Sequence, residues 1–153
     1  MKTLYFIRNG IAEHNVLFNK IGEKAFYDKK YYDPRLTNDG VEQSIILGQT
    51  WKGLASIELV ICSPLTRTLE TAGNIFTGID VNILAFDMIK EFPQGLQTVN
   101  KRSDKKKLIN EYPRIDFTNI SEMDDMWNSE REETVDELNE RINQFNTFLE
   151  TRK

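Results

Sequence analysis

Cysteine, histidine and proline are scarce in this sequence of 153 residues, which holds one cysteine, one histidine and four prolines. A single cysteine excludes an internal disulfide, and Cys62 lies in an apolar run typical of small core residues. Eight glycines and 39% hydrophobic residues exclude the fibrous and disordered classes. The composition therefore favours one globular domain over residues 1–153, with a hydrophobic core.

Long apolar runs are also missing. No stretch approaches the roughly 18 apolar residues of a transmembrane helix, and the run that precedes Arg8 is too short for a signal peptide. The net charge of −4 gives no long-range attraction to nucleic acid or to an anionic membrane. We therefore expect a soluble, cytoplasmic protein without nucleic-acid or membrane partners, in which a local cluster must hold any anionic ligand.

Short apolar runs alternate with helical patterns in the first half of the chain. Three of them have the composition of buried strands: Thr3 to Ile7, Leu59 to Cys62 and Val81 to Phe86. We expect one helix from Asn38 to about Trp51, capped by Thr37, and another from Ser63-Pro64 to about Phe76. This alternation predicts βαβ units and an α/β fold with a mostly parallel sheet flanked by helices.

The remaining segments differ in the strength of their patterns. Residues 11–35 predict a loop with one short helix, and residues 91–127 an irregular cap with a helix from Lys105 to Glu111. The clearest helix runs from Thr134 to Glu150, where Thr134 and Glu137 have the spacing of a capping box. Its apolar stripe comprises Val135, Leu138, Ile142, Phe145 and Leu149.

Two arginines follow predicted strands. Arg8 ends the first strand, and Arg67 comes shortly after the second, in a helix whose N-terminus adds positive potential. Because parallel strands end at one edge of a sheet, the two guanidinium groups can converge on a phosphate dianion. The alternative is that each arginine caps a carbonyl or pairs with a surface carboxylate. The basic run from Lys101 to Lys107 suggests an anionic partner, although a solvated loop or helix face explains it better.

Three segments resemble the histidine phosphatases (phosphoglycerate mutase-like proteins) in the right order. Residues 4–15, LYFIRNGIAEHN, resemble the opening strand that ends in Arg-His-Gly. The two other segments are DPRLTNDGVEQ at residues 33–43 and SPLTRTLETA at residues 63–72. The resemblance implies a three-layer α/β/α, phosphoglycerate mutase-like fold. It also implies roles: Arg8, Asn15 and Arg67 would bind phosphate, and Glu91 would stand at the proton-donor position.

The chain departs from this family in two respects. Asn9 occupies the position of the nucleophilic histidine, and an amide nitrogen has no free lone pair for attack on phosphorus. The family also carries a second active-site histidine on a strand that follows a helix like Thr134 to Glu150, whereas this sequence ends at Lys153. The only histidine is His14, so a two-histidine site cannot form.

His14 lies five residues after Asn9. We expect it to be a loop residue that contacts either the substrate or solvent, and a role as replacement nucleophile is the weaker interpretation. We expect neither a cofactor nor a metal. The resemblance also places the strand of the second histidine beside Thr3 to Ile7. The lack of this neighbour predicts an exposed sheet edge and self-association, unless a segment such as residues 11–32 covers it.

The favoured function is a catalytically impaired relative of phosphoglycerate mutases that binds phosphate or a phosphorylated small molecule. The main alternative is an active phosphatase or phosphomutase of which this chain is a truncated or Asn9-substituted form. A degraded gene product without a selected function is a third possibility. Whether the protein is an enzyme stays open at this point, as does the identity of the substrate.

Overall fold

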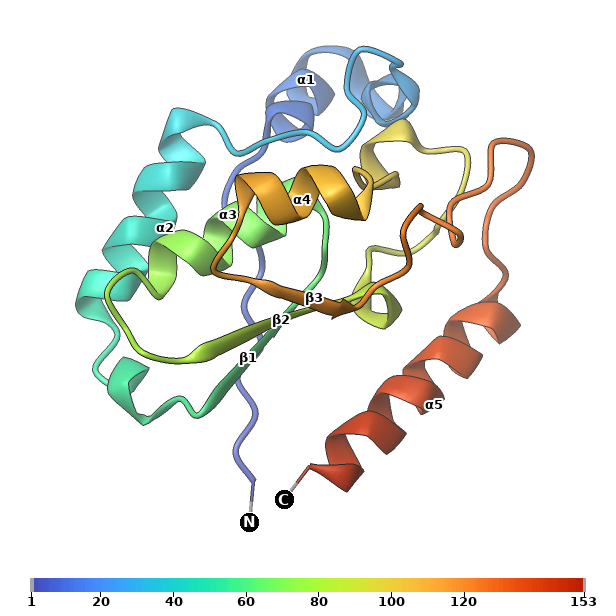
Figure 1. Ribbon diagram of the computed structural model, residues 1–153. Coiled ribbons are helices and arrows are strands. Elements are labelled where there is room, and N and C mark those ends of the chain that lie inside the picture. The colour runs from blue at the N-terminus through green and yellow to red at the C-terminus, as the bar shows by residue number, and fades with distance from the viewer. Residues whose placement is uncertain (1, 153) are drawn as a thin grey trace.

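A parallel three-stranded sheet forms the centre of the molecule, which is described by a computed structural model over residues 2–152 (Figure 1). Its strands are β1 (Leu59–Cys62), β2 (Asn82–Phe86) and β3 (Asp116–Asn119), in that spatial order. Leu59 pairs with Asn82, and the register continues to Cys62 and Ala85. The predicted α/β class with a parallel sheet is confirmed.

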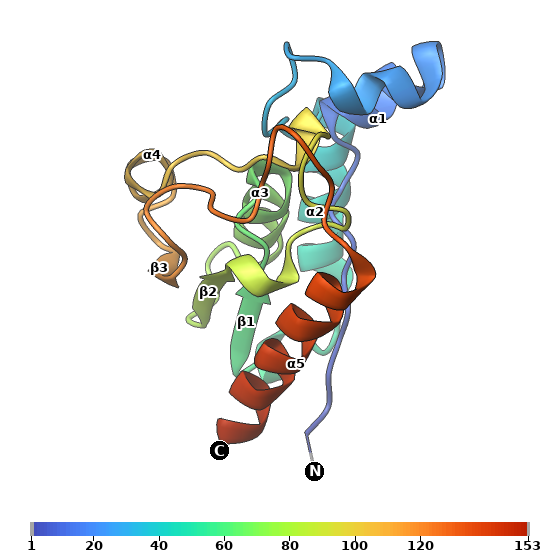
Figure 2. The ribbon, with the colours of Figure 1, turned by 90° about the vertical axis from the view of Figure 1, so that its right-hand side faces the viewer.

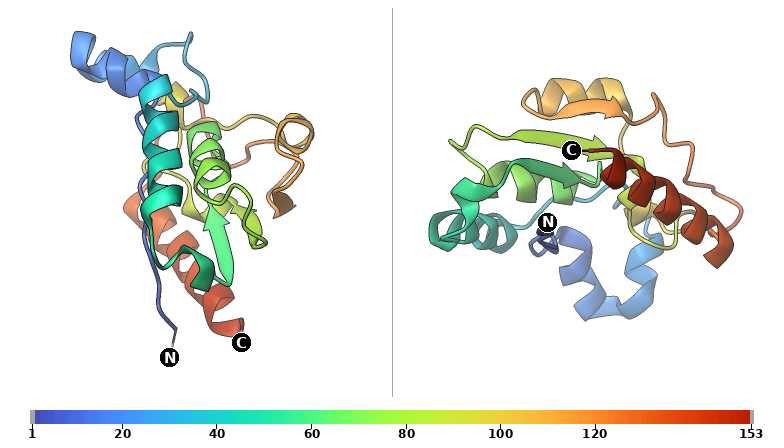
Figure 3. Two further views of the ribbon diagram at one scale, coloured as in Figure 1. Left: turned by 90° about the vertical axis from the view of Figure 1, so that its left-hand side faces the viewer. Right: turned by 90° about the horizontal axis from the view of Figure 1, so that it is seen from below.

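Helices cover both faces of the sheet. The helices are α1 (Glu13–Ile21), α2 (Asn38–Thr50), α3 (Thr66–Ile75), α4 (Lys105–Glu111) and α5 (Val135–Thr151). Figures 1 and 3 show α2 and α5 on opposite sides of the sheet. On the α5 side, the ring of Phe86 at the end of β2 lies 5.7 Å from that of Phe145 and 4.5 Å from that of Phe148. Alternate strand residues therefore serve two cores, as the period of a strand requires.

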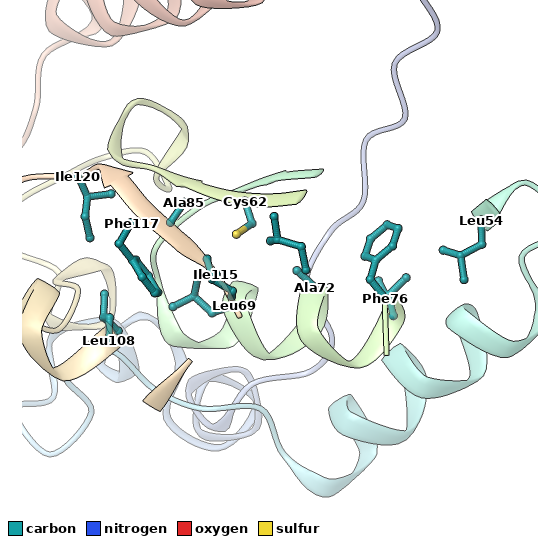
Figure 4. Packing of buried hydrophobic residues seen from close by; sticks show 12 residues of the cluster. Leu54, Cys62, Leu69, Ala72, Phe76, Ala85, Leu108, Ile115, Phe117 and Ile120 are labelled. Atoms are coloured by element: carbon teal, nitrogen blue, oxygen red, sulfur yellow. The ribbon is translucent and has the colours of Figure 1, made fainter. Parts of the chain in front are cut away.

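The larger core lies between the sheet and α3 (Figure 4). Leu69 and Ile75 of α3 pack there with Ile83 and Ala85 of β2. Cys62 is buried in the same cluster, as predicted, and burial raises the pKa of its thiol to about 12, which makes it an unreactive core residue. Leu69 is completely buried, so its truncation to alanine would cost about 2–5 kcal/mol of stability.

The helix starts are set by local capping. The side chain of Thr37 accepts a hydrogen bond from the N–H of Gly40, and Thr134 with Glu137 forms the predicted capping box. Helix α3 begins at Thr66 and not at Ser63. Ser63 precedes a proline, which disfavours helical backbone, and Leu65 is still extended.

Two segments contain more regular structure than predicted. The stretch 11–35 holds α1 and a 3-10 helix (Gly22–Tyr27), and the expected irregular cap contains β3. Strand β3 has four residues, of which only Phe117 is buried. Its polar neighbours give no alternating pattern long enough to indicate a strand.

The first predicted strand is not formed. Residues 3–7 are an extended segment without a strand partner within residues 2–152, drawn as a plain trace in Figure 2. Leu4 is 57% exposed and Phe6 is 91% exposed. Only Tyr5 has an aromatic neighbour, Trp51, at 5.1 Å between ring centroids. The prediction of a buried strand was wrong because burial requires neighbouring strands, which local composition cannot supply.

Candidate functional site

Arg67 is the most buried of the predicted site residues. It lies in the first turn of α3, directly after β1, and is 2% exposed. Its Nη1 donates to the backbone oxygen of Val99 at 2.7 Å, and its Nη2 donates to Oδ1 of Asn100 at 3.1 Å. The segment that contains Val99 and Asn100 therefore fixes the direction of the guanidinium group.

Both acceptors of Arg67 are neutral, which sets it apart from the two other buried arginines in the described chain. Arg102 donates twice to Asp87, at 2.7 and 3.0 Å, and Arg141 is paired with Glu133. No carboxylate within residues 2–152 is hydrogen bonded to Arg67, and burial lowers its pKa. A buried cation without a hydrogen-bonded anionic partner is energetically unfavourable, so this position favours an added anion.

Two other predicted residues lie next to Arg67. Oε2 of Glu91 is 3.9 Å from Nη2 of Arg67, beyond hydrogen-bond distance, and the Glu91 side chain is 58% exposed. Arg8 is exposed, and its positive charge contributes to the lowered pKa values of both Arg67 and His14. The structure thus places Glu91 beside Arg67, with Arg8 near enough for its charge to act on Arg67 and His14.

The side-chain amide of Asn9 is bonded to the backbone of the next residue. Its Nδ2 donates to the carbonyl oxygen of Gly10 at 2.8 Å. The N–H of Gly10 donates to Oγ1 of Thr71, one turn after Arg67 on α3. Gly10 also packs directly against α2, since a Cβ at this position would lie 2.5 Å from the oxygen of Gly40. Asn9 is therefore held at the same end of α3 as Arg67.

His14 and Asn15 form one hydrogen-bonded pair. Nδ2 of Asn15 lies 3.2 Å from Nε2 of His14, while Oδ1 of Asn15 accepts the N–H of Ala12 at the start of α1. If the Asn15 amide donates, the Nε2 lone pair of His14 is engaged and Nδ1 carries the proton. The amide oxygen of Asn15 and one of its amide hydrogens are consequently engaged within α1 and its first turn. One amide hydrogen remains for a ligand.

His14 is buried, in contrast to the expected solvent-facing loop residue. It is 6% exposed, and its ring lies 6.2 Å from that of Phe26. Burial, with smaller contributions from Arg67 and Arg8, lowers the pKa of His14 to about 4. The imidazole is therefore neutral at physiological pH, and its Nδ1 has no hydrogen-bond partner within the described residues.

The N-terminus of α3 already has an anionic partner within the protein. The prediction that this helix start adds free positive potential is therefore wrong. The buried carboxylate of Asp33 accepts the N–H of Thr66 at 2.7 Å and its hydroxyl at 2.8 Å. It also accepts the N–H of Ser103 at 2.8 Å. An acidic side chain at this position satisfies the helix terminus. The site thus depends on the arginine side chains and not on the helix dipole.

Sequence reasoning missed four residues that shape this site: Asp33, Thr71, Val99 and Asn100. Asp33 and Thr71 belong to the segments that resemble the family, so the motifs carried a signal for both. Val99 contributes only a backbone oxygen, and Asn100 lies in a segment without any pattern. Within residues 2–152, no cluster of three histidine, cysteine, aspartate or glutamate side chains is suited to a metal ion. The same residues contain no helix that is long and apolar enough to span a membrane.

Known proteins share this sequence pattern over almost the whole chain. The family model for the histidine phosphatase superfamily (branch 1) matches residues 4–153. Phosphoglycerate mutase-like protein 1 of Arabidopsis thaliana is 32% identical, over 99% of this chain and 64% of its own length. Phosphomutase-like protein 3 of Candida albicans is 27% identical, over 87% of this chain and 47% of its own length. The chain thus spans less than two thirds of the length of either relative.

Solved structures have the same fold. The ecdysone phosphate phosphatase of Bombix mori superimposes with a TM-score of 0.58 at 19% identity, covering 92% of this chain and 66% of its own. The alpha-ribazole phosphatase of Shigella flexneri superimposes with a TM-score of 0.56 at 21% identity, and the match covers 94% of this chain and 65% of the length of that protein. At these identities the likeness concerns the fold, and the family model supplies the assignment. The chain belongs to branch 1 of the histidine phosphatase superfamily.

Proposed function

We propose that this protein binds phosphate or a phosphorylated small molecule between Arg8 and Arg67 and has little phosphohistidine-based turnover. The observation that carries the proposal is that Arg67 has no hydrogen-bonded anionic partner, since its nearest ion-pair partner, Glu91, lies 3.9 Å away on an exposed side chain. Its guanidinium group is buried but bonded only to neutral oxygens, whereas Arg102 and Arg141 each have a carboxylate. A phosphate dianion would supply the missing charge and accept the remaining N–H donors.

Impaired turnover follows from the chemistry of the side chains at this edge. The amide of Asn9 is hydrogen bonded to Gly10 and has no nucleophilic lone pair. His14, the only histidine of the sequence, has its acceptor nitrogen beside the Asn15 amide. Neither side chain offers a free lone pair for attack on phosphorus, so a covalent phosphoenzyme is not expected.

The class of ligand is inferred from the site and from the relatives together. The structural neighbours are an ecdysone phosphate phosphatase and an alpha-ribazole phosphatase, whose names indicate phosphorylated small molecules as substrates. Arg8 and Glu91 are exposed whereas Arg67 is buried, so the organic part of such a ligand would lie on the side of Arg8 and Glu91. The proposed ligand is therefore a phosphomonoester, recognised mainly through its phosphate group.

The proposal is tested by thermal melting in the presence of phosphate and sulfate. At a concentration of 100 times the dissociation constant, binding stabilises the fold by about 2.7 kcal/mol, which is a measurable shift in Tm. Arg8→Ala removes an exposed side chain and should weaken the shift without unfolding the protein. Arg131→Ala removes the same charge from an exposed pair with Glu137 and is the matched control. Equal shifts in all three proteins would rule out this site.

An active phosphatase or phosphomutase is the second candidate. Its support is the position of Glu91, whose carboxylate lies 3.9 Å from Arg67, where the family resemblance expects a proton donor. In this case the chain is a truncated or Asn9-substituted form of a longer enzyme. Hydrolysis of an aryl phosphate that depends on Arg8 would favour this candidate over the first.

We also propose that residues 3–7 mediate self-association. The segment is extended and exposed, and β1 uses one edge for β2 while its other edge has no strand within residues 2–152. Free backbone donors and acceptors together with an apolar side chain such as Phe6 favour pairing with a second chain. This proposal is independent of anion binding.

A further inference from the structure

The chain contains a single Asn-Gly dipeptide, Asn9-Gly10, and it stands inside the candidate site. Asparagine followed by glycine is chemically the most labile asparagine sequence, because glycine has no side chain to obstruct attack by its own nitrogen. Glycine also permits the backbone conformations that ring closure requires. Asn9 is partly exposed, so water can reach the amide.

We propose that Asn9-Gly10 is a deamidation site and that its hydrogen bond to Thr71 slows the reaction. Conversion of Asn9 to aspartate would then block oxyanion binding at Arg8 and Arg67. The consequence for binding rests on the proposed function. The modification itself rests only on the local geometry.

The reaction requires water and no other reactant. The backbone nitrogen of Gly10 loses its proton and attacks Cγ of Asn9, the Cγ–Nδ2 bond breaks, and ammonia leaves with the proton. Water then opens the cyclic imide at one of its two carbonyls, which gives aspartate or isoaspartate. The net change replaces a neutral amide by a carboxylate, without oxidation or reduction.

The side chain of Asn9 is already folded over the reacting bond. Its Nδ2 donates to the oxygen of Gly10 at 2.8 Å, which brings the amide group across the Asn9-Gly10 peptide. The Asn9 amide is therefore held beside the residue whose nitrogen attacks Cγ. The site is therefore predisposed to react whenever the Gly10 nitrogen becomes free.

Thr71 keeps this nitrogen occupied. The Gly10 N–H donates to Oγ1 of Thr71 at 3.1 Å, and the Thr71 hydroxyl itself donates to the oxygen of Arg67 at 2.7 Å. The second bond orients the hydroxyl, so that a lone pair faces Gly10. The close approach of Gly10 to Gly40 further prevents rotation of the peptide. Deamidation must therefore wait for a local opening that breaks the Gly10–Thr71 bond.

A carboxylate at position 9 would change the electrostatics of the site. It would stand directly after Arg8 in the chain. Gly10 is bonded to Thr71, and Thr71 to the backbone oxygen of Arg67, so this segment is held against the first turns of α3. The added carboxylate would offset part of the positive charge of Arg8 and Arg67, and a phosphate dianion would meet like charge. The modification would thus act as an irreversible off switch for anion binding.

Peptide mapping by mass spectrometry tests the modification. We expect Thr71→Val to deamidate at residue 9 about five- to tenfold faster than the parent at mildly alkaline pH, the factor that loss of one hydrogen bond gives. Thr71→Ser keeps the hydroxyl and should match the parent. Leu108→Ala, a core truncation in α4, controls for general destabilisation. Equal rates in the valine and serine variants, or an equal acceleration in Leu108→Ala, would overturn the role of Thr71.

The consequence for binding is tested with Asn9→Asp in the phosphate melting assay. We expect the phosphate-dependent shift of the parent to be lost in this variant, and a retained shift would refute the switch. A parent without any phosphate response would refute the proposed function and with it this consequence. The rates at residue 9 would still decide whether the modification site is real.

Discussion

Asp33 and Thr66 are joined by two hydrogen bonds that fix the start of α3: Oδ1 of Asp33 accepts the Thr66 N–H, and Oδ2 accepts its hydroxyl. Asp33 adopts a positive φ of 48° to reach this position. Because it also accepts the N–H of Ser103, one carboxylate links α3 to the segment that precedes α4. The orientation of Arg67, the next residue of α3, depends on this connection.

We predict that Asp33→Ala lowers the free energy of unfolding by about 2–3 kcal/mol, because three donors lose a charged acceptor. Urea denaturation of the parent and the variant measures the difference. Asp80→Ala removes an exposed carboxylate and should change stability by less than about 0.5 kcal/mol. Equal stability of Asp33→Ala and the parent would show that Asp33 does not hold α3 in place.

The sequence predicted those parts of the fold in which local chemistry and tertiary packing agree. The capping box of Thr134 and Glu137, the helix Lys105–Glu111 and the strand Leu59–Cys62 are found as expected, although only Cys62 of this strand is buried. The strand over residues 3–7 was predicted from the same kind of pattern but is exposed, because a strand also needs a partner that no local pattern guarantees. Strand β3 was missed for the opposite reason, since its pairing with β2 compensates for a polar composition.

Hydrolysis of a generic aryl phosphate should not exceed a protein-free control. Loss of the nucleophile in a covalent mechanism can cost on the order of 10⁶ in turnover, as in serine protease variants. Asn9→His should restore little activity, because His14 would be the only other histidine in this sequence. Phosphate release assays on the parent, on Asn9→His and on Arg8→Ala measure this. Strong recovery in Asn9→His, abolished by Arg8→Ala, would instead support the active-enzyme candidate.

The pH dependence of stability should report on His14. Its pKa falls from an ordinary 6.5 to about 4 on folding, so the unfolded chain binds the proton more readily. The stabilisation from this residue is complete above pH 6.5 and is lost as the pH falls towards 4. It amounts to about 2.5 kcal/mol between neutral pH and pH 4.5.

Denaturation of the parent and of His14→Gln across this pH range isolates the effect, since the glutamine variant should have a flatter profile. Because His14 is the only histidine, its imidazole proton resonances also give the pKa directly. An observed value near 6.5 would contradict the burial of the ring. Parallel stability profiles of the two proteins would lead to the same conclusion.

Within the candidate site, the motifs predicted which residues converge but not how they are used. Glu91 lies 3.9 Å from Arg67, as the resemblance implied, and the charge of Arg8 acts on Arg67 although the strand expected before Arg8 is not formed. The motif could not indicate that Asn15 caps α1, because the same amide serves either a helix or a ligand. It also could not indicate that Arg67 donates its hydrogen bonds to neutral acceptors, since these belong to Val99 and Asn100, more than 30 residues away.

The last prediction concerns association through residues 3–7. We expect the parent to form dimers or larger species as its concentration rises, because Phe6 and Leu4 expose apolar surface beside unpaired backbone groups. Phe6→Lys adds a charge to this segment and should shift the protein towards the monomer. Met123→Lys makes the same kind of change at another exposed apolar residue, 66% exposed, and should leave association unchanged. Light scattering across a concentration series measures the species, and amide exchange at Leu4 and Phe6 shows whether the segment becomes protected. A parent that stays monomeric with fast-exchanging amides at both residues would contradict pairing through this segment.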